Sequence, residues 1–181
     1  MTAAEIEAIY RARADSARTR YTEADVQFMT RMIGHHAQAL EMAELAPGRT
    51  QNPQILTLSA RIINAQADEI RTMQQWLRDR NQPVPEPDHA MGHGPVAMPG
   101  MLTPEQMQSL AAASGEDFDL LLLTFMIQHH AGAVTMVEEL FRTDGAAQDE
   151  EVFKFASDAQ VDQRTEIERM EQMLAQLRFA Q

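Results

Sequence analysis

Cysteine is absent from the 181 residues, which excludes disulfides, thiolate metal sites, iron–sulfur clusters and cysteine nucleophiles. No uninterrupted apolar run approaches the roughly 20 residues that a membrane-spanning helix needs, so no membrane span is expected. Lysine occurs once, at Lys154, and the net charge is -12, so nucleic acid is not an expected partner, because phosphate binding depends on clustered Lys and Arg. The 44% share of hydrophobic residues is nevertheless enough for a core in one domain covering 1-181.

Helical periodicity and capping residues predict an all-α chain without strands. Thr22 with Asp25 forms a capping-box pattern, Asn52-Pro53 has the pattern of a helix start, and Pro47-Gly48 is expected to end the helix before it. Five prolines and three glycines exclude a regular element from most of 81-102. The expected helices cover about 3-18, 22-46, 52-80, 103-115, 117-141 and 150-178.

The chain contains an internal repeat. Residues 24-45 align without gaps on 118-139 with 10 identities in 22 positions, and 66-77 match 163-174 at six of 12 positions. Each repeat is one helical hairpin, and a single hairpin cannot cover its own apolar stripe. Two tandem hairpins are therefore expected to form a four-helix bundle with approximate twofold symmetry. The predicted divisions are an N-terminal helical extension (1-22), a first hairpin (23-80), a Pro/Gly/His/Met-rich linker (81-102) and a second hairpin with a short leading helix (103-181).

Both copies of the repeat carry the motif D-x6-M-x2-H-H-x5-M on a predicted helix. Steps of four and three residues place one histidine of each pair on a single core-facing seam. The two seams are Phe28, Met32, His35, Ala39 and Met42, and Leu122, Met126, His129, Ala133 and Met136. The second histidine of each pair, His36 or His130, is displaced by about 100° around the helix axis and lies four residues after a seam methionine.

A structural reading competes with a metal-binding one at these positions. A methionine stripe usually fills a core, and a histidine on an apolar face is more often a hydrogen-bonded core residue than a ligand. Duplication favours metal, because four imidazoles buried in one layer without partners are costly, and bundle cores commonly hold metal sites. Imidazole with thioether and no thiolate suits copper, as Cu(I) or Cu(II), with zinc as an alternative. Imidazole must lose its proton to bind a metal, whereas thioether need not, so weaker copper binding at acidic pH is expected.

The helices that partner the two histidine helices carry matched polar residues at Gln66 and Gln163, and at Glu69 and Glu166. These side chains could hydrogen-bond the second ring nitrogen of a ligand histidine and fix its tautomer. A capped core glutamine or an ordinary surface glutamate explains each of them equally well.

The linker holds further histidines and methionines among glycine and proline: His89, Met91, His93, Met98 and Met101. A His/Met tract in a Pro/Gly loop has the composition of a metal-capture segment. The equal alternative is an ordinary linker laid on the bundle with its methionines docked down.

Enzyme signatures are missing from the sequence. There is no Glu-x-x-His pair of a di-iron bundle, no H-E-x-x-H, no Gly-rich phosphate loop and no G-x-S-x-G elbow. The chain is therefore expected to have no catalytic activity.

The two Met-Ile-x-His-His segments, with Met-Pro-Gly-Met-Leu-Thr-Pro-Glu-Gln-Met at 98-107 between them, resemble the bacterial proteins catalogued as domain of unknown function 305. The resemblance spans about residues 22-178. It implies a ferritin-like four-helix bundle, usually exported, with some members linked to copper binding and tolerance. Carried over by position, the implied metal ligands are Met32, His35, His36, Met42, Met126, His129, His130 and Met136, with the linker His and Met residues.

These observations lead to a non-catalytic protein that binds, buffers or transfers copper. A metal ion is its expected partner, and a protein partner for metal transfer is left open. The first alternative is a structural or partner-binding helical bundle whose core histidines are hydrogen-bonded and bind no metal. A third option, a metal-dependent redox enzyme, would need an open coordination position on the metal. The first twenty residues hold four arginines and no apolar stretch of a signal peptide. A periplasmic or extracellular location is expected from the resemblance, and a cytoplasmic one stays open.

Overall fold

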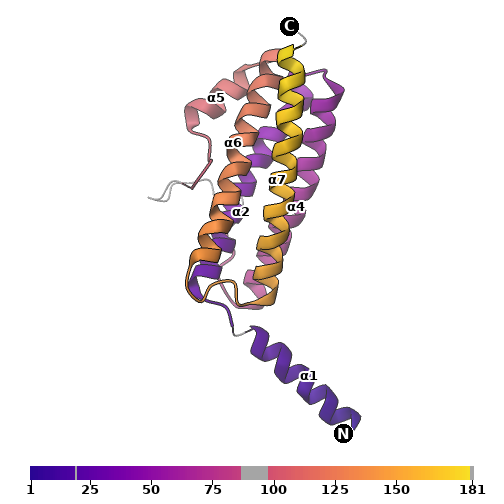
Figure 1. Ribbon diagram of the computed structural model, residues 1–181, viewed down its shortest axis with the longest axis vertical. Helices are drawn as coiled ribbons and strands as arrows, with labels where there is room; N and C mark the ends of the chain where they lie inside the picture. The colour runs from indigo at the N-terminus through magenta and orange to yellow at the C-terminus, as the bar shows by residue number, and fades with distance from the viewer. Residues whose placement is uncertain (19, 87–97, 180–181) are drawn as a thin grey trace.

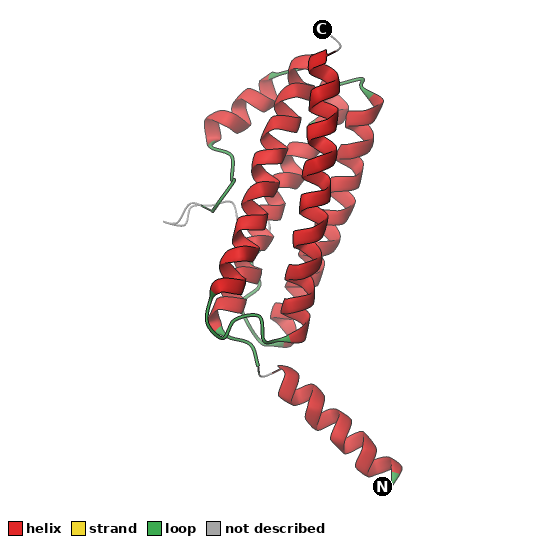
Figure 2. Cartoon of the chain, in the orientation of Figure 1, coloured by secondary structure: helices red, strands yellow, loops and turns green. Residues whose placement is uncertain are grey.

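The computed structural model describes residues 1-18, 20-86 and 98-179, and in these ranges it contains helices and loops but no strand (Figure 2). The all-α prediction is confirmed. The helices are α1 (Ala3–Arg18), α2 (Glu23–Glu44), α3 (Ala46–Arg49), α4 (Pro53–Asp79), α5 (Pro104–Ala112), α6 (Gly115–Arg142) and α7 (Glu150–Phe179).

The predicted helix starts are present with their capping contacts. The Thr22 hydroxyl accepts a hydrogen bond from the Asp25 backbone N–H, and the Asp25 carboxylate accepts one from the Thr22 N–H. Thr103 and Gln106 form the same reciprocal pair at α5, and Asn52 caps α4. Each cap satisfies backbone donors that the first helical turn leaves without partners.

Two predicted boundaries were wrong. Pro47 and Gly48 do not end a long helix, because α2 already stops at Glu44 and these residues lie inside the short helix α3. Proline is tolerated there because the first turn of a helix needs no backbone N–H donors. Gly115 does not mark the end of α5, which finishes at Ala112. With φ +61° it instead begins α6.

Four long helices lie side by side as a bundle (Figure 1). Helix α2 packs on α4, α6 packs on α7, and the two hairpins meet along α2 and α6. Helix α1 projects away from one end of the bundle, and Ile6, Ile9 and Tyr10 on it are exposed. The seam between α4 and α7 is the loosely packed side, where these helices are separated by surface depressions.

Among the described residues, α6 alone has the length and apolar composition of a membrane-spanning helix. The core helix of a bundle passes the same test, and α6 carries His129 and His130 in its middle, both buried against other helices. Its apolar character matches its position in the bundle interior.

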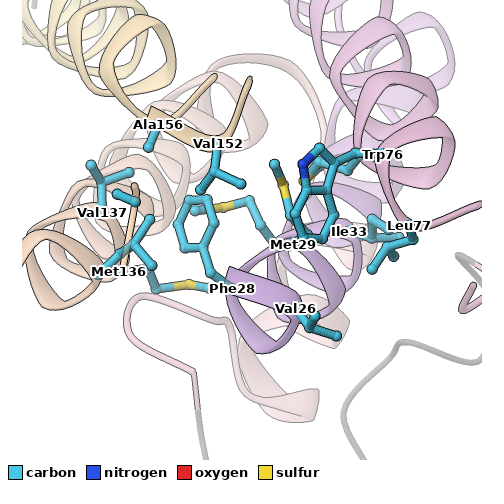
Figure 3. Close-up of a cluster of buried hydrophobic side chains, with 14 of the residues drawn as sticks. Val26, Phe28, Met29, Ile33, Trp76, Leu77, Met136, Val137, Val152 and Ala156 are labelled. Carbon is cyan, nitrogen blue, oxygen red and sulfur yellow. The ribbon is translucent and has the colours of Figure 1, made fainter. Parts of the chain in front are cut away.

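The bundle interior contains two apolar clusters, one toward each end. The first cluster includes Phe28, Met32, Trp76, Met136 and Val152, and Figure 3 shows Phe28 and Met136 among its side chains. The second cluster includes Met42, Ile62, Phe118, Met126 and Met170. Along α2 and α7 the chain passes from the first cluster to the second, and along α4 and α6 it runs the other way. Each hairpin is therefore antiparallel, as expected for tandem copies.

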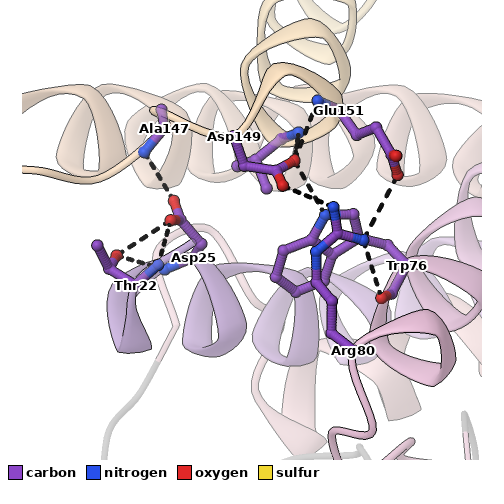
Figure 4. A network of polar contacts seen from close by, with 8 residues as sticks. Thr22, Asp25, Trp76, Arg80, Ala147, Asp149 and Glu151 are labelled. Atoms are coloured by element: carbon purple, nitrogen blue, oxygen red, sulfur yellow. Dashed lines mark hydrogen bonds and ion pairs between the residues drawn. The ribbon is translucent and has the colours of Figure 1, made fainter. Parts of the chain in front are cut away.

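Buried polar contacts hold the end of the bundle that carries the first cluster (Figure 4). The guanidinium of Arg80 lies 2.6 Å from the carboxylate of Asp149 and stacks 4.3 Å from the ring centre of Trp76. The Trp76 indole N–H also donates to Asp149. Nearby, Asp25 accepts a hydrogen bond from the backbone N–H of Ala147 in the α6–α7 loop.

Candidate metal centre

A polar layer crosses the bundle between the two apolar clusters. Helices α2 and α6 each contribute a histidine pair to it, and α4 and α7 each contribute a glutamine: His35 and His36, His129 and His130, Gln66 and Gln163. None of these six side chains is more than 3% exposed. The rings of His35 and His129 pack on each other with centroids 3.9 Å apart, and those of His129 and His130 lie 6.2 Å apart. The four histidines of the repeat are thus brought together, as the duplication predicted.

Three of the four imidazoles have an oxygen acceptor at Nε2. His35 Nε2 donates to the Pro99 carbonyl at 2.9 Å, His130 Nε2 donates to Glu166 at 2.7 Å, and His36 Nε2 pairs with Glu69. Carbonyl and carboxylate oxygens only accept, so Nε2 carries the hydrogen in each ring. In the neutral ring the lone pair is then on Nδ1.

The Nδ1 atoms of all four histidines are buried and have no hydrogen-bond partner among the residues that the structure describes. For His129, Nε2 is also without a partner. A buried imidazole nitrogen without a partner is unfavourable in a purely structural core. An N–H held by a carboxylate or a backbone carbonyl, with the other nitrogen open, is the arrangement of a metal-ligating histidine. The donor chemistry of the layer therefore fits a metal ion.

Burial and neighbouring histidines keep two of these rings neutral. Burial, followed by the electrostatic effect of the neighbouring His36, lowers the pKa of His35 from 6.5 to about 3. Burial, followed by His35 and His130, holds the pKa of His129 well below its ordinary value. At these two rings, protons compete with a metal only at strongly acidic pH. Acid should therefore weaken metal binding at His35 and His129 only at a lower pH than it would for an ordinary imidazole.

The seam methionines lie on both sides of the polar layer. Met32 and Met136 belong to the first cluster, and Met42 and Met126 belong to the second, all with at most 3% exposure. Because α2 and α6 are antiparallel, the methionine before the histidine pair in one copy lies on the same side as the methionine after it in the other. The histidine layer is thus flanked by two pairs of methionines, one pair in each apolar cluster.

The end of the linker covers one face of the layer. We call residues 99-102 the linker strap. The side chain of Gln38 exchanges two hydrogen bonds with the backbone of Leu102, at 3.1 and 2.8 Å. On α6, a Cβ at Gly132 would lie 2.0 Å from the Pro99 carbonyl oxygen, so only glycine allows this approach. The strap brings the Pro99 carbonyl to His35.

The opposite face of the layer borders a depression between α4 and α7, which we call the α4–α7 cleft. The side chains of Gln66, Gln163, Glu69 and Glu166 line it. Glu69 and Glu166 do hydrogen-bond His36 and His130, so the second-layer role considered for them is present in the geometry. The two glutamines are buried, but no bond joins them to a histidine.

The predicted linker ligands divide into two groups. Met98 is half-buried against the first cluster, as the docked-linker alternative predicted, and Met101 is also half-buried. His89, Met91 and His93 lie outside the described residues.

Among the residues that the structure does describe, no three His, Cys, Asp or Glu side chains are grouped closely enough to hold a metal ion. A site with three or more ligands in the described layer therefore needs donors besides these side chains, and the seam methionines are candidates.

The family model described as Domain of unknown function (DUF305) matches residues 25-174. The chain belongs to the DUF305 family. A DUF305 fragment from Deinococcus radiodurans has 30% sequence identity and a TM-score of 0.74, covering 86% of this chain and 98% of that one. A DUF305 protein from Streptomyces coelicolor is 27% identical with a TM-score of 0.74, covering 85% and 92%.

Another DUF305-like structure in this comparison is CopM in its Cu(II)-bound form, with 30% identity, a TM-score of 0.69 and coverage of 84% and 96%. CopM has also been solved with Cu(I) bound. In sequence, an uncharacterized protein of Acanthamoeba polyphaga mimivirus is 38% identical over 56 residues, which make up 31% of this chain and 37% of the viral protein. The chain thus spans little more than a third of that relative.

Three contributors to the site were missed by sequence reasoning: Gln38, Pro99 and Gly132. The repeat held a usable signal, because Gln38 and Gly132 occupy equivalent positions but differ completely in size. That difference marks the place where the single linker crosses two otherwise similar helices.

Proposed function

We propose that this DUF305 protein is a non-catalytic copper-binding protein that buffers copper or passes it to a protein partner. The observation that supports this most directly is the set of four buried histidines whose Nδ1 atoms have no partner in the described part of the chain, three of them with Nε2 held by an oxygen acceptor. The copper-bound structures of CopM support the choice of metal.

We propose that each copper ion binds through one or two of the Nδ1 atoms of His35, His36, His129 and His130, completed by thioethers from Met32, Met42, Met126 and Met136. Thioethers favour Cu(I), imidazoles accept Cu(II) and zinc as well, and the absence of cysteine leaves no competing thiolate. The linker residues His89, Met91, His93, Met98 and Met101 form a second proposed set for capture.

A periplasmic or extracellular location is part of the proposal. The relative from Streptomyces coelicolor carries a name that marks it as a secreted protein, which supports this location. Copper handling outside the cytoplasm also agrees with a ligand set that needs no reduced cysteine.

Titration of the purified protein with Cu(I) and Cu(II) against a competing chelator tests the proposal. We expect binding tighter than micromolar, lost when His35, His36, His129 and His130 are replaced. Replacing His89 and His93 instead measures the contribution of the linker. Absence of binding tighter than micromolar would leave the alternative, a structural bundle with hydrogen-bonded histidines.

A milder pair of variants keeps the core intact. Met32→Leu with Met126→Leu preserves side-chain volume and removes two thioethers, so Cu(I) affinity should fall at least tenfold while the fold persists. Met29→Leu is the matched control, because Met29 is equally buried and its counterpart in the second copy is already Leu123. An equal effect of both changes would contradict thioether ligation.

A further inference from the structure

The α4–α7 cleft combines carboxylates with buried amide oxygens that lack partners. Glu69, Asp162 and Glu166 line it, and Arg61 is the one cation among its lining residues. The carbonyl oxygens of Gln66 and Gln163, whose side chains line the same cleft, are buried without a hydrogen bond. Both glutamines are at most 3% exposed. Oxygen acceptors thus outnumber donors among the side chains that line the cleft, and two of the acceptors have no partner among the described residues.

The carboxylates of the cleft act on one another. Burial, followed by the charges of Glu69, Asp158 and Glu166, raises the pKa of Asp162 above its ordinary value. The bonds to His36 and His130 use only Oε2 of Glu69 and Glu166. A cation in the cleft would relieve this repulsion and satisfy the amide oxygens.

The volume of the cleft indicates whether that cation would be bare or would keep its water shell. Its volume is about 250 Å³, room for about eight waters at roughly 30 Å³ each. The described carboxylates and histidines are not grouped closely enough to coordinate a bare ion. An ion that keeps its water shell fits both observations, because its waters can donate to oxygens spaced more widely than direct ligands.

We propose that the α4–α7 cleft is a docking site for a hydrated divalent cation and the access route by which a metal ion reaches the buried histidine layer. The docking step stands on the cleft alone, and the inward step rests on the proposed function. Glu69 and Glu166 connect the two, because each lines the cleft and hydrogen-bonds a histidine of the layer. Among the described residues, the linker strap covers part of the opposite face, whereas the cleft borders the layer on the α4–α7 side.

Docking is tested with Mn²⁺, which prefers oxygen ligands and is a poor match for imidazole with thioether. Electron paramagnetic resonance titration of the full chain should show millimolar or tighter Mn²⁺ binding. Asp162→Asn should weaken it at least threefold, and Arg61→Gln should strengthen it. Glu171→Gln is the charge-matched control, because Glu171 lies nine residues after Asp162 on α7 and therefore about 180° around the helix axis from it. Equal weakening by Asp162→Asn and Glu171→Gln, or no Mn²⁺ binding, would overturn the docking site.

The access route is tested by stopped-flow quenching of Trp76, the single tryptophan, after addition of Cu(II). Asp162→Asn should slow Cu(II) association three- to tenfold at low salt and reduce its salt dependence, with Glu171→Gln close to wild type. Unchanged association in Asp162→Asn would overturn the access route. If Mn²⁺ docks but no copper reaches the histidine layer, the proposed function fails and the docking site stands.

Discussion

The ring centroids of His35 and His129 lie 3.9 Å apart, with an angle of 39° between the ring planes. The two residues occupy the same motif position, one in each copy of the repeat. Two positive charges at that separation would repel by about 4 kcal/mol at an effective dielectric constant near 20. The contact is therefore compatible with neutral rings, and neutral imidazole is the form that binds metal. This relationship connects the duplication directly to the chemistry of the layer.

The stability of the metal-free protein should fall as the pH is lowered from 7.5 to 5. The pKa of His35 is about 3 in the folded protein and near 6.5 in the unfolded chain, so the unfolded chain takes up the proton first. His35 alone should then lower the free energy of unfolding by about 2 kcal/mol at pH 5. Urea unfolding in the presence of a chelator measures this, and His35→Gln should flatten the slope. Equal stability at pH 7.5 and 5 would contradict the burial of neutral rings.

Gly132→Ala should displace the linker strap from α6. The added Cβ would meet the Pro99 carbonyl oxygen and the Gly100 Cα, both backbone atoms that cannot move aside independently. We expect a loss of about 1–3 kcal/mol in unfolding free energy, as for other overpacked sites. Gly48→Ala is the control, because nothing lies within 4 Å of a Cβ there. Chemical denaturation of the two variants side by side gives the comparison, and equal stability would refute the close approach.

Gln38→Ala should loosen the same strap from the α2 side. The substitution removes two hydrogen bonds and leaves the buried N–H and C=O of Leu102 without partners. The expected loss is about 1–3 kcal/mol, with faster hydrogen exchange at the Leu102 amide. Gln27→Ala removes only an exposed side-chain bond to Glu23 and should change neither quantity. Unaltered exchange at Leu102 in the Gln38 variant would show that the strap is held elsewhere.

Asp149→Ala should be among the most destabilising single changes in the bundle. It leaves the guanidinium of Arg80 buried without its main partner and removes the acceptor of the Trp76 N–H. Breaking a buried ion pair of this kind costs about 3–5 kcal/mol. Glu151→Ala removes the other carboxylate near Arg80, but Glu151 is 63% exposed, so its loss should cost no more than about 1 kcal/mol. Thermal unfolding of both variants distinguishes the two roles, and equal losses would disprove the assignment.

Much of the fold could be predicted from the sequence because local signals agree with the packing. Thr22 and Asp25 form the predicted capping box, and both histidine seams are buried along their whole length. The repeat predicted which helices meet, because identical motifs on α2 and α6 must share one interior. Pro47 was misread because a proline ends one helix or begins another with the same local chemistry.

The candidate site was predictable only in part. The histidine pairs come together as the repeat predicted, and Glu69 and Glu166 were among the partners considered for them. The Pro99 carbonyl could not be found in this way, since a backbone oxygen has no signature in a sequence. The ion pair of Arg80 with Asp149, at one end of the bundle, could not be predicted either, because the two residues are 69 positions apart and the repeat does not relate them.

The linker strap makes the surroundings of the two histidine pairs different, although the two hairpins are copies of one repeat. A doubled hairpin supplies the same ring at His35 and His129, but a single crossing segment can reach only one of them. The Pro99 carbonyl therefore fixes the orientation of His35, whereas the described part of the linker gives His129 no such contact. The linker strap thus sets the tautomer of one ring before any ion binds and leaves the tautomer of its twin unset.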